Sequence, residues 1–369
     1  MSAKIKGFVK TNIVMLIAAL LAVITSIIVP PDEKYLSYFD FKTLTCLFCV
    51  LAVVCALRNI RFFYTLAKAI IRKFKNTKIS ILVLVYITFI GSMLIANDMA
   101  LLTFLPLGYF VLHTTRKEKY MAFTFIMQNI AANLGGMLTP FGNPQNLYLY
   151  SKFNIPDAEF ITIMLPPFLV SVTLITVCCL VFVKSEPLVI EEKAAALPPI
   201  RVSVYLLLFF FSIFIVFDIV PYWIGLIIIP IALLFLDKMA LLQVDYGLLL
   251  TFVFFFIFSG NMARIDAVRD FFSFLLEKNT LVVSALSCQF ISNVPSAVLL
   301  SQFTENYREL LLGVNIGGVG TLISSLASLI TFREYSKDDP GHTLSYILKF
   351  TAFNVLFLVI LIVFCQFFK

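Results

Sequence analysis

Two polar interruptions in long apolar stretches carry the side chains best suited to bind an ion. The first contains Asn97 and Asp98, and the second contains Ser292, Asn293 and Ser296. Asp98 is the strongest candidate, because a carboxylate at the centre of a membrane helix costs roughly 2.5–3.5 kcal/mol on insertion scales and by default marks a functional site. A carboxylate that caps the following helix is the alternative interpretation, and the two roles are compatible.

Downstream of each interruption lies a second one, over residues 133–147 and 315–329, through which no helix can run undisturbed. The first of these contains three Gly and two Pro, which add backbone freedom and remove backbone donors. Within a membrane, freed backbone groups are tolerated only where they face protein or line a polar cavity. Helix N-termini at such breaks suit an anion, whereas carbonyl, hydroxyl and amide oxygens suit Na⁺. The candidate ligands at the breaks are Thr139, Asn143, Gln145, Asn146, Asn315, Thr321, Ser324 and Ser325.

We therefore predict that substrate and ion bind where the tips and the breaks meet, near the middle of the membrane. Na⁺ is expected near Asn97, Asp98, Asn143 and Asn293. The coupling ion is Na⁺ or H⁺, because a carboxylate in this setting can exchange a proton for a cation. No catalytic residue and no cofactor are expected. For each Ser or Thr, a hydrogen bond within its own or a neighbouring helix is the simpler interpretation.

The interruptions occur in the same order in both halves of the chain. Residues 315–329 align with residues 133–147 without a gap, and the matched pairs include Asn133 with Asn315 and Thr139 with Thr321. One unpaired helix before the second copy makes the number of preceding crossings odd, so the copies are predicted to be inverted. Interrupted helices at matching places in two halves indicate a transporter binding site.

The composition indicates a membrane protein. The chain has 369 residues, of which 61% are hydrophobic and only 13% are charged, whereas soluble proteins have about 25% charged residues. Its net charge of +7 comes from basic residues beside apolar stretches, which favours the positive-inside rule over nucleic-acid binding. Two His residues do not readily build a metal site or a catalytic triad, and the seven Cys are expected to be buried apolar residues.

The sequence thus predicts an all-α polytopic membrane protein with two inverted-topology repeats, each with a re-entrant hairpin and a broken transmembrane helix. A kinked full crossing is the alternative to the first hairpin. The first repeat is predicted at 1–183, with a hairpin tip at 96–98 and a broken helix over 120–150. The remainder is a cytoplasmic linker at 184–201 and a linking span plus second repeat at 202–369, with a hairpin tip at 292–296 and a broken helix over 310–332.

Basic residues predict the orientation in the membrane. Lys4, Lys6 and Lys10 precede the first apolar stretch, and a basic amphipathic helix predicted within residues 58–78 lies in the headgroup region. Both clusters place the N-terminus in the cytoplasm, and the plasma membrane is the expected location. A cleaved signal peptide is disfavoured, because the sequence after Ile28 offers no small-residue cleavage site.

These motifs resemble the ion-transporter superfamily, which contains arsenite permeases, NhaD-type sodium/proton antiporters and citrate or dicarboxylate carriers. The likeness rests on the Asn97-Asp98 tip, the Gly- and Pro-rich break at 135–146 and the Ser292-Asn293 tip. It implies ion-coupled transport by two scaffold–transport repeats, and homodimers. The carboxylate carriers carry Ser-Asn-Thr at both tips, so a carboxylate substrate beside Asp98 needs a proton or a cation there.

Several functions fit these observations. The first is a secondary transporter that moves a small anion or weak acid, such as a carboxylate, coupled to H⁺ or Na⁺. The alternatives are a sodium/proton antiporter that uses Asp98, an arsenite efflux permease and a channel. An intramembrane enzyme would need a nucleophile with a base or a second carboxylate, and Asp98 has no such companion in the sequence.

Overall fold

The computed structural model describes residues 12–188 and 196–367. Helices dominate these ranges, and the described residues form no strand, only an isolated bridge between Asn76 and Pro187. Seven of the described helices are long and apolar enough to cross a membrane. The predicted all-α polytopic membrane fold is therefore confirmed. The N-terminal lysines and part of the predicted linker lie outside the described residues.

The first half of the chain contains eight α-helices in the described residues. They are α2 (Ile13–Ile28), α3 (Phe41–Asn59), α4 (Phe62–Ile71), α5 (Thr77–Ile95), α6 (Asn97–Thr114), α7 (Met121–Gly135), α8 (Pro144–Lys152) and α9 (Asp157–Phe182). Short 3-10 turns lie at Glu33–Tyr38, Glu118–Tyr120 and Gly136–Leu138.

The second half contains nine α-helices in the described residues. Its described helices are α10 (Pro199–Val216), α11 (Tyr222–Leu236), α12 (Lys238–Leu242), α13 (Tyr246–Ala263), α14 (Asp266–Ile291), α15 (Asn293–Leu300), α16 (Tyr307–Ile316), α17 (Leu326–Asp338) and α18 (Thr343–Phe367). The label α14 covers two helices, as predicted, because Asn279 between them has a non-helical backbone with φ −167° and ψ 90°. The short helix α12 was not predicted.

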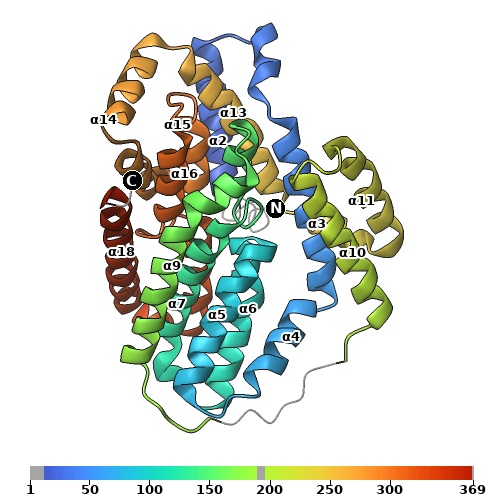
Figure 1. The fold of residues 1–369 in the computed structure, drawn as a ribbon, viewed down its shortest axis with the longest axis vertical. Coiled ribbons are helices and arrows are strands. Elements are labelled where there is room, and N and C mark those ends of the chain that lie inside the picture. The colour runs from blue at the N-terminus through green and yellow to red at the C-terminus, as the bar shows by residue number, and fades with distance from the viewer. Residues whose placement is uncertain (1–11, 189–195, 368–369) are drawn as a thin grey trace.

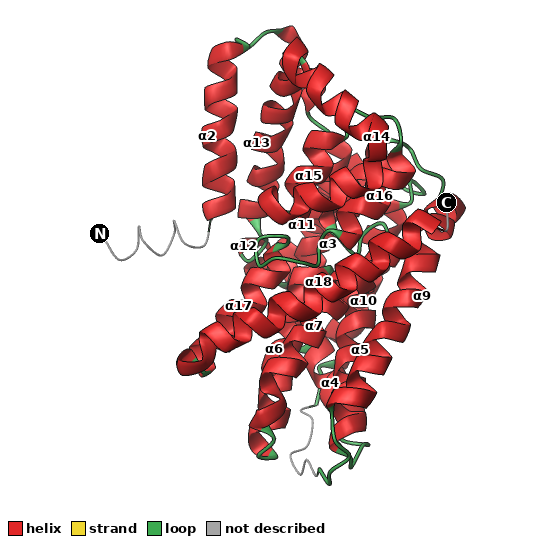
Figure 2. Ribbon diagram, turned by 90° about the vertical axis from the view of Figure 1, so that its left-hand side faces the viewer, coloured by secondary structure: helices red, strands yellow, loops and turns green. Residues whose placement is uncertain are grey.

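The two hairpins lie toward opposite ends of the molecule. Helices α5 and α6 pack side by side in the lower half of Figure 1, whereas α14 and α15 lie in the upper half, and Figure 2 shows the same separation. Inverted repeats require such an arrangement. The inversion across a membrane, the homodimer and the domain boundaries stay predictions.

The corners of the two hairpins have the same backbone geometry. Ala96 has φ 65° and ψ 154°, and Ser292 has φ 73° and ψ 160°. A positive φ is unfavourable for residues other than Gly and persists only where the surroundings impose it. After each corner an Asn accepts a hydrogen bond from the next backbone N–H, 2.9 Å for Asn97 and 3.0 Å for Asn293.

Both predicted broken helices are interrupted where the Gly-rich segments lie. Helix α7 ends at Gly135 and α8 begins at Pro144, a position that suits proline because the first helical N–H has no partner. Likewise α16 ends at Ile316 and α17 begins at Leu326. The interruption removes backbone groups from the helical hydrogen-bond pattern, and buried side chains satisfy some of them. The amide nitrogen of Asn146 lies 3.2 Å from the carbonyl oxygens of Gly136 and Met137.

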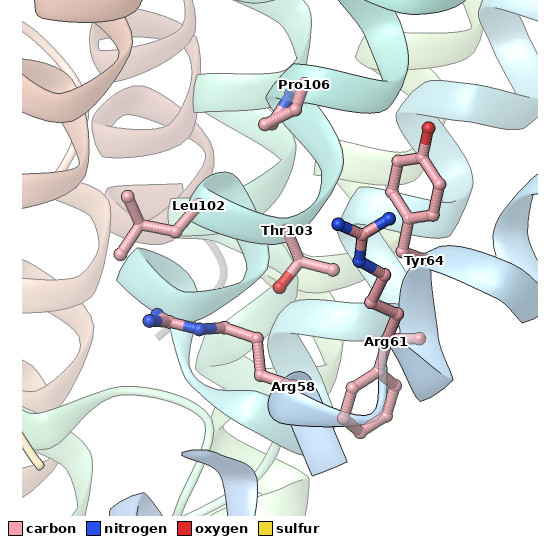
Figure 3. A pocket seen from close by; sticks show the side chains of 7 residues that line it. Arg58, Arg61, Tyr64, Leu102, Thr103 and Pro106 are labelled. Carbon is pink, nitrogen blue, oxygen red and sulfur yellow. The ribbon is translucent and has the colours of Figure 1, made fainter. Parts of the chain in front are cut away.

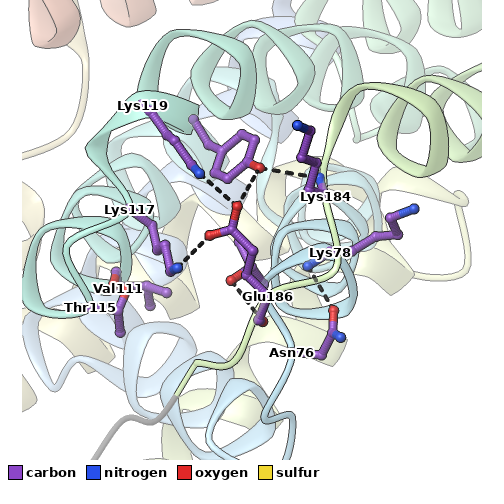
Figure 4. A network of polar contacts seen from close by, with 10 residues as sticks. Asn76, Lys78, Val111, Thr115, Lys117, Lys119, Lys184 and Glu186 are labelled. Atoms are coloured by element: carbon purple, nitrogen blue, oxygen red, sulfur yellow. Dashed lines mark hydrogen bonds and ion pairs between the residues drawn. The ribbon is translucent and has the colours of Figure 1, made fainter.

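One carboxylate fastens the segment after α9 to the loop between α6 and α7. Glu186 forms ion pairs with Lys117 and, at 2.6 Å, with Lys119, and Tyr120 donates a hydrogen bond to it (Figure 4). Hydrogen bonds from Lys117 and Lys119 lower the pKa of Glu186 to about 2. The backbone N–H of Thr77 also donates to the carbonyl of Glu186 at 2.8 Å, which holds this segment against the start of α5.

Candidate functional site

The two hairpin corners line one cavity of about 310 Å³. Asn97 and Asp98 reach it from the first corner, and Ser292 and Asn293 reach it from the second. Gln145, from the start of α8, adds a fifth polar side chain. The predicted meeting of both tips at one place is therefore present in the structure, and most of the remaining wall is apolar, as is usual for a small-molecule site.

Asn97 joins the first corner to the first broken helix. Its side-chain amide donates a hydrogen bond to Oδ1 of Asn133 at 3.2 Å, and its side chain is 3% exposed. The neighbouring Asp98 differs, because its buried Oδ1 has no hydrogen-bond partner among the described residues. A buried carboxylate oxygen without a partner is costly, and a bound cation or proton would satisfy it.

Asn293 joins the second corner to the second broken helix. Its backbone N–H donates to the carbonyl of Ser324 at 2.9 Å, and the hydroxyl of Ser292 donates to the same carbonyl at 3.3 Å. The amide nitrogen of Asn293 lies 3.2 Å from the point where a Cβ on Gly318 would stand, so a larger residue at 318 would crowd the corner. Each corner thus rests on the break that follows it in sequence.

A network of buried amides connects the two halves beneath the cavity. Asn315 Oδ1 accepts hydrogen bonds from the side-chain amides of Asn143 at 3.1 Å and Gln145 at 3.4 Å. In return, Asn315 donates to Oδ1 of Asn146 at 2.5 Å. These four side chains are at most 1% exposed. Oδ1 of Asn143 and Oε1 of Gln145 keep no partner among the described residues, so both oxygens are available to a cation.

Several predicted ligands hold the breaks in place instead of lining the cavity. Thr139 donates to the carbonyl of Met93 at 2.6 Å, and Thr321 donates to the carbonyl of Gln289 at 3.1 Å. These are corresponding bonds, each from a break to the last turn before a corner. Ser296, Ser324, Asn143 and Asn146 are likewise absent from the lining of the cavity.

Ser324 and Ser296 form hydrogen bonds within the protein, away from the cavity. Ser324 donates to the carbonyls of Gly318 at 2.9 Å and Thr321 at 2.8 Å. The Ser296 hydroxyl pairs with that of Ser287 at 2.9 Å. In this structure these side chains hold the site in place, and the binding of an ion by them stays a prediction.

Sequence reasoning missed a second carboxylate at the cavity, Asp245, and the expectation that Asp98 has no companion is wrong. Asp245 lies just before α13, where its Oδ1 accepts a hydrogen bond from the N–H of Leu248 at 2.9 Å. It lines the same cavity as Asp98 and is exposed, whereas Oδ1 of Asp98 is not. A charged residue beside an apolar stretch looks like an ordinary helix cap, so only the fold reveals that Asp245 and Asp98 line the same cavity.

The charged side chains that line the cavity are acidic. Asp98 and Asp245 are its charged side chains, and no basic side chain from the described residues lines it. No group of three or more His, Cys, Asp or Glu among the described residues is arranged to hold a metal ion. Mixed carboxylate and amide oxygens suit a weakly held cation such as Na⁺ better than a transition metal.

Comparison with known proteins gives three matches. The sequence profile of the family described as "Citrate transporter" matches residues 3–306, which include both hairpin corners and the first broken helix. An uncharacterized transporter of Methanocaldococcus jannaschii is 33% identical over 308 residues, covering 83% of this chain and 84% of that protein. The inner membrane protein YbiR of Escherichia coli is 28% identical over 278 residues, covering 74% of each chain.

Proposed function

This chain belongs to the citrate transporter family, and from that premise we propose that it carries a small anion or weak acid, such as a carboxylate, together with H⁺ or Na⁺. It is an integral membrane protein and a transporter of citrate-transporter type. The substrate and the coupling ion are the proposed part. A cytoplasmic N-terminus in the plasma membrane is proposed as well, from the basic residues that flank α4 on both sides.

One observation carries the anion proposal. Four helices of the described chain begin at the wall of the cavity, with their first residues at Asn97, Asn293, Pro144 and Leu326. Each helix N-terminus places the positive end of the helix dipole at the cavity, equivalent to roughly half an elementary charge. Some of the first-turn N–H groups already donate within the protein, among them those of Asp98 and Val294, so the dipoles are the main attraction for an anion. Several such ends around one cavity favour an anion there.

The carboxylates make a cation necessary. An anion that binds beside Asp98 and Asp245 meets two negative side chains with no basic side chain among the described lining residues. Protonation of these groups or a bound Na⁺ removes that repulsion. The unpartnered oxygens of Asp98 and Gln145 are the ligands we propose for it. Binding of the anion then depends on binding of the cation, which is the basis of coupled transport.

The same acidic wall favours a second candidate, sodium/proton antiport without an anion. In that case Asp98 and Asp245 would exchange a proton for Na⁺, and the helix N-termini would serve to stabilise the ionised carboxylates. The two functions differ in whether a labelled anion crosses the membrane.

Flux through purified protein in lipid vesicles tests the proposal. Labelled citrate is offered under an imposed Na⁺ gradient, an imposed pH gradient, or neither, and smaller carboxylates and arsenite are tested in parallel. We expect one cation gradient to drive uptake of an anion above its equilibrium level. Exchange of Na⁺ for H⁺ with no anion flux would favour antiport and contradict the anion proposal.

A further inference from the structure

A second cavity, of about 520 Å³, lies where the end of α3 and the start of α4 face helix α6. Arg58, in the last turn of α3, and Arg61, just before α4, contribute its basic side chains. Leu102, Thr103 and Pro106 form the wall on α6. Figure 3 shows both arginine side chains reaching the space beside α6.

The guanidinium groups in this cavity are not neutralised by the protein. Neither Arg58 nor Arg61 forms an ion pair among the described residues, and Nη1 of Arg58 contacts the sulfur of Met99 at 3.6 Å, a weak acceptor. A guanidinium carries five N–H donors in a planar arrangement that matches carboxylate and phosphate oxygens. Two of them at one cavity provide a site for an oxyanion.

The basic cavity adjoins the substrate site through a narrow space. Leu102 lines both the basic cavity and a cavity of about 60 Å³ that Asp98 also lines, and Asp98 lines the 310 Å³ cavity in turn. The middle space has room for a few water molecules and none for a carboxylate ion of several carbons. Met99 lines it as well, and Met99 is the residue that Arg58 contacts.

We propose that Arg58 and Arg61 form an outer binding site, on the predicted cytoplasmic side of the central cavity, that captures the transported anion before the narrow space at Met99 and Leu102 widens to admit it. This inference rests on the proposed function and names a site outside the hairpin corners. It also resolves a conflict in the central cavity, whose wall is acidic. The basic residues that attract an anion stand at the entrance, and the helix N-termini and the cation hold it inside.

The phosphate of a lipid headgroup shares the chemistry of a transported oxyanion. The position of Arg58 favours the transported ion, since its guanidinium contacts Met99 beside the hairpin corner and the residue is half-buried. Arg61 is exposed and would be the first contact for a headgroup. The experiment below separates the two sources.

Thiol labelling of Leu102→Cys tests the site without relying on transport. All seven native cysteines are buried, so they give a low background. In vesicles of neutral phosphatidylcholine, the rate of modification is compared for a negatively charged sulfonate reagent and a positively charged ammonium reagent. We expect the negative reagent to be favoured, and citrate or inorganic phosphate to slow its reaction.

Two variants that each remove one positive charge, one inside the cavity and one outside it, test whether the effect is local. Arg58→Gln is expected to lower the ratio of the two rates at least about threefold and to remove protection by the anion. Arg72→Gln removes the same charge at the end of the same basic segment, is exposed, and does not line the cavity, so it should leave both unchanged. Equal effects of the two variants, or protection by neither anion, would overturn the inference.

Two further measurements distinguish the transported anion from a lipid headgroup, and the outer site from the proposed function. If added phosphatidylglycerol abolishes the protection by citrate and phosphate, a headgroup occupies the site and the proposed capture is wrong; we expect no such loss. Flux measurements on Arg58→Gln should give a half-saturating anion concentration about tenfold higher at a similar maximal rate. A further outcome is that an anion protects the thiol introduced by Leu102→Cys although the otherwise unchanged protein transports none. That result would contradict the proposed function but would support the outer site.

Discussion

Asp98 and Asp245 line one cavity although they come from different halves of the chain. Asp98 lies in the first turn of α6, and Asp245 caps the start of α13. One carboxylate is exposed and the other has a buried oxygen without a partner. A cation that enters the cavity therefore meets Asp245 at an accessible position and Asp98 at a shielded one. This arrangement suits a path that leads the cation from solvent to the site where it is coupled to the anion.

Neutralising either carboxylate should uncouple transport. We expect Asp98→Asn to reduce the stimulation of anion uptake by the cation gradient about tenfold or more, because the shielded ligand is lost. Asp245→Asn should weaken cation affinity with a smaller effect on maximal rate. Asp266→Asn, at the exposed start of α14, is the control and should behave as the unchanged protein. Full gradient dependence in Asp98→Asn would remove Asp98 from the mechanism.

The amide network should stabilise the fold as well as the site. Asn315→Ala leaves the side-chain amide of Gln145 and Oδ1 of Asn146 without their partner, whereas the amide of Asn143 keeps its bond to the carbonyl of Asn133. Because a buried polar group without a partner costs about 1–3 kcal/mol, the free energy of unfolding should fall by at least about that amount. Unfolding in detergent measures it. Asn59→Ala, at an exposed amide bonded to Asp237, is the control and should change stability little.

The first break should not tolerate a methyl group at Gly142. A Cβ there would stand 2.3 Å from the carbonyl oxygen of Gly136, which is backbone and cannot move aside without opening the break. We expect Gly142→Ala to abolish transport and to lower the midpoint of thermal unfolding by several degrees. At Gly341 the nearest atom to an added Cβ is 4.0 Å away, so Gly341→Ala should do neither. Normal transport by Gly142→Ala would contradict the geometry of the break.

The Glu186 ion pairs predict a pH dependence outside the membrane. Lys117 and Lys119 hold the pKa of Glu186 at about 2, below its ordinary value of 4.5. A carboxyl whose pKa is lowered by folding contributes stability above the unfolded pKa and loses it as pH falls through the folded value. The difference in thermal midpoint between the unchanged protein and Glu186→Gln should thus be constant from pH 7 to about 5 and shrink below about 4. A difference that grows on acidification would contradict this assignment.

The sequence predicted the parts of the site that depend on local chemistry. The Asn97 and Asn293 corners and the two Gly-rich breaks interrupt apolar helices, and such interruptions can be read directly from residue types. Their meeting at one cavity followed from the matched order of the two halves. The prediction of two elements within α14 is confirmed, because Asn279 has a non-helical backbone (φ −167°, ψ 90°) that breaks the helix between them.

What the sequence could not predict depends on contacts between distant segments. Nothing near Asp245 distinguishes it from an ordinary helix cap, and its neighbour in space comes from another part of the chain. Thr139 and Thr321 were predicted as ligands from composition, but the direction of their hydroxyls is set by the carbonyls of Met93 and Gln289. Arg58 and Arg61 indicated a membrane face, and only the fold placed them beside α6.

Binding of citrate to the purified protein, titrated with and without Na⁺ and at two pH values, tests the central claim most directly. We predict that one of these cations tightens citrate binding at least about tenfold, and that citrate tightens binding of the cation by the same factor. Asp98→Asn should remove this mutual effect. Citrate affinity that is the same at every Na⁺ concentration and pH would contradict the account.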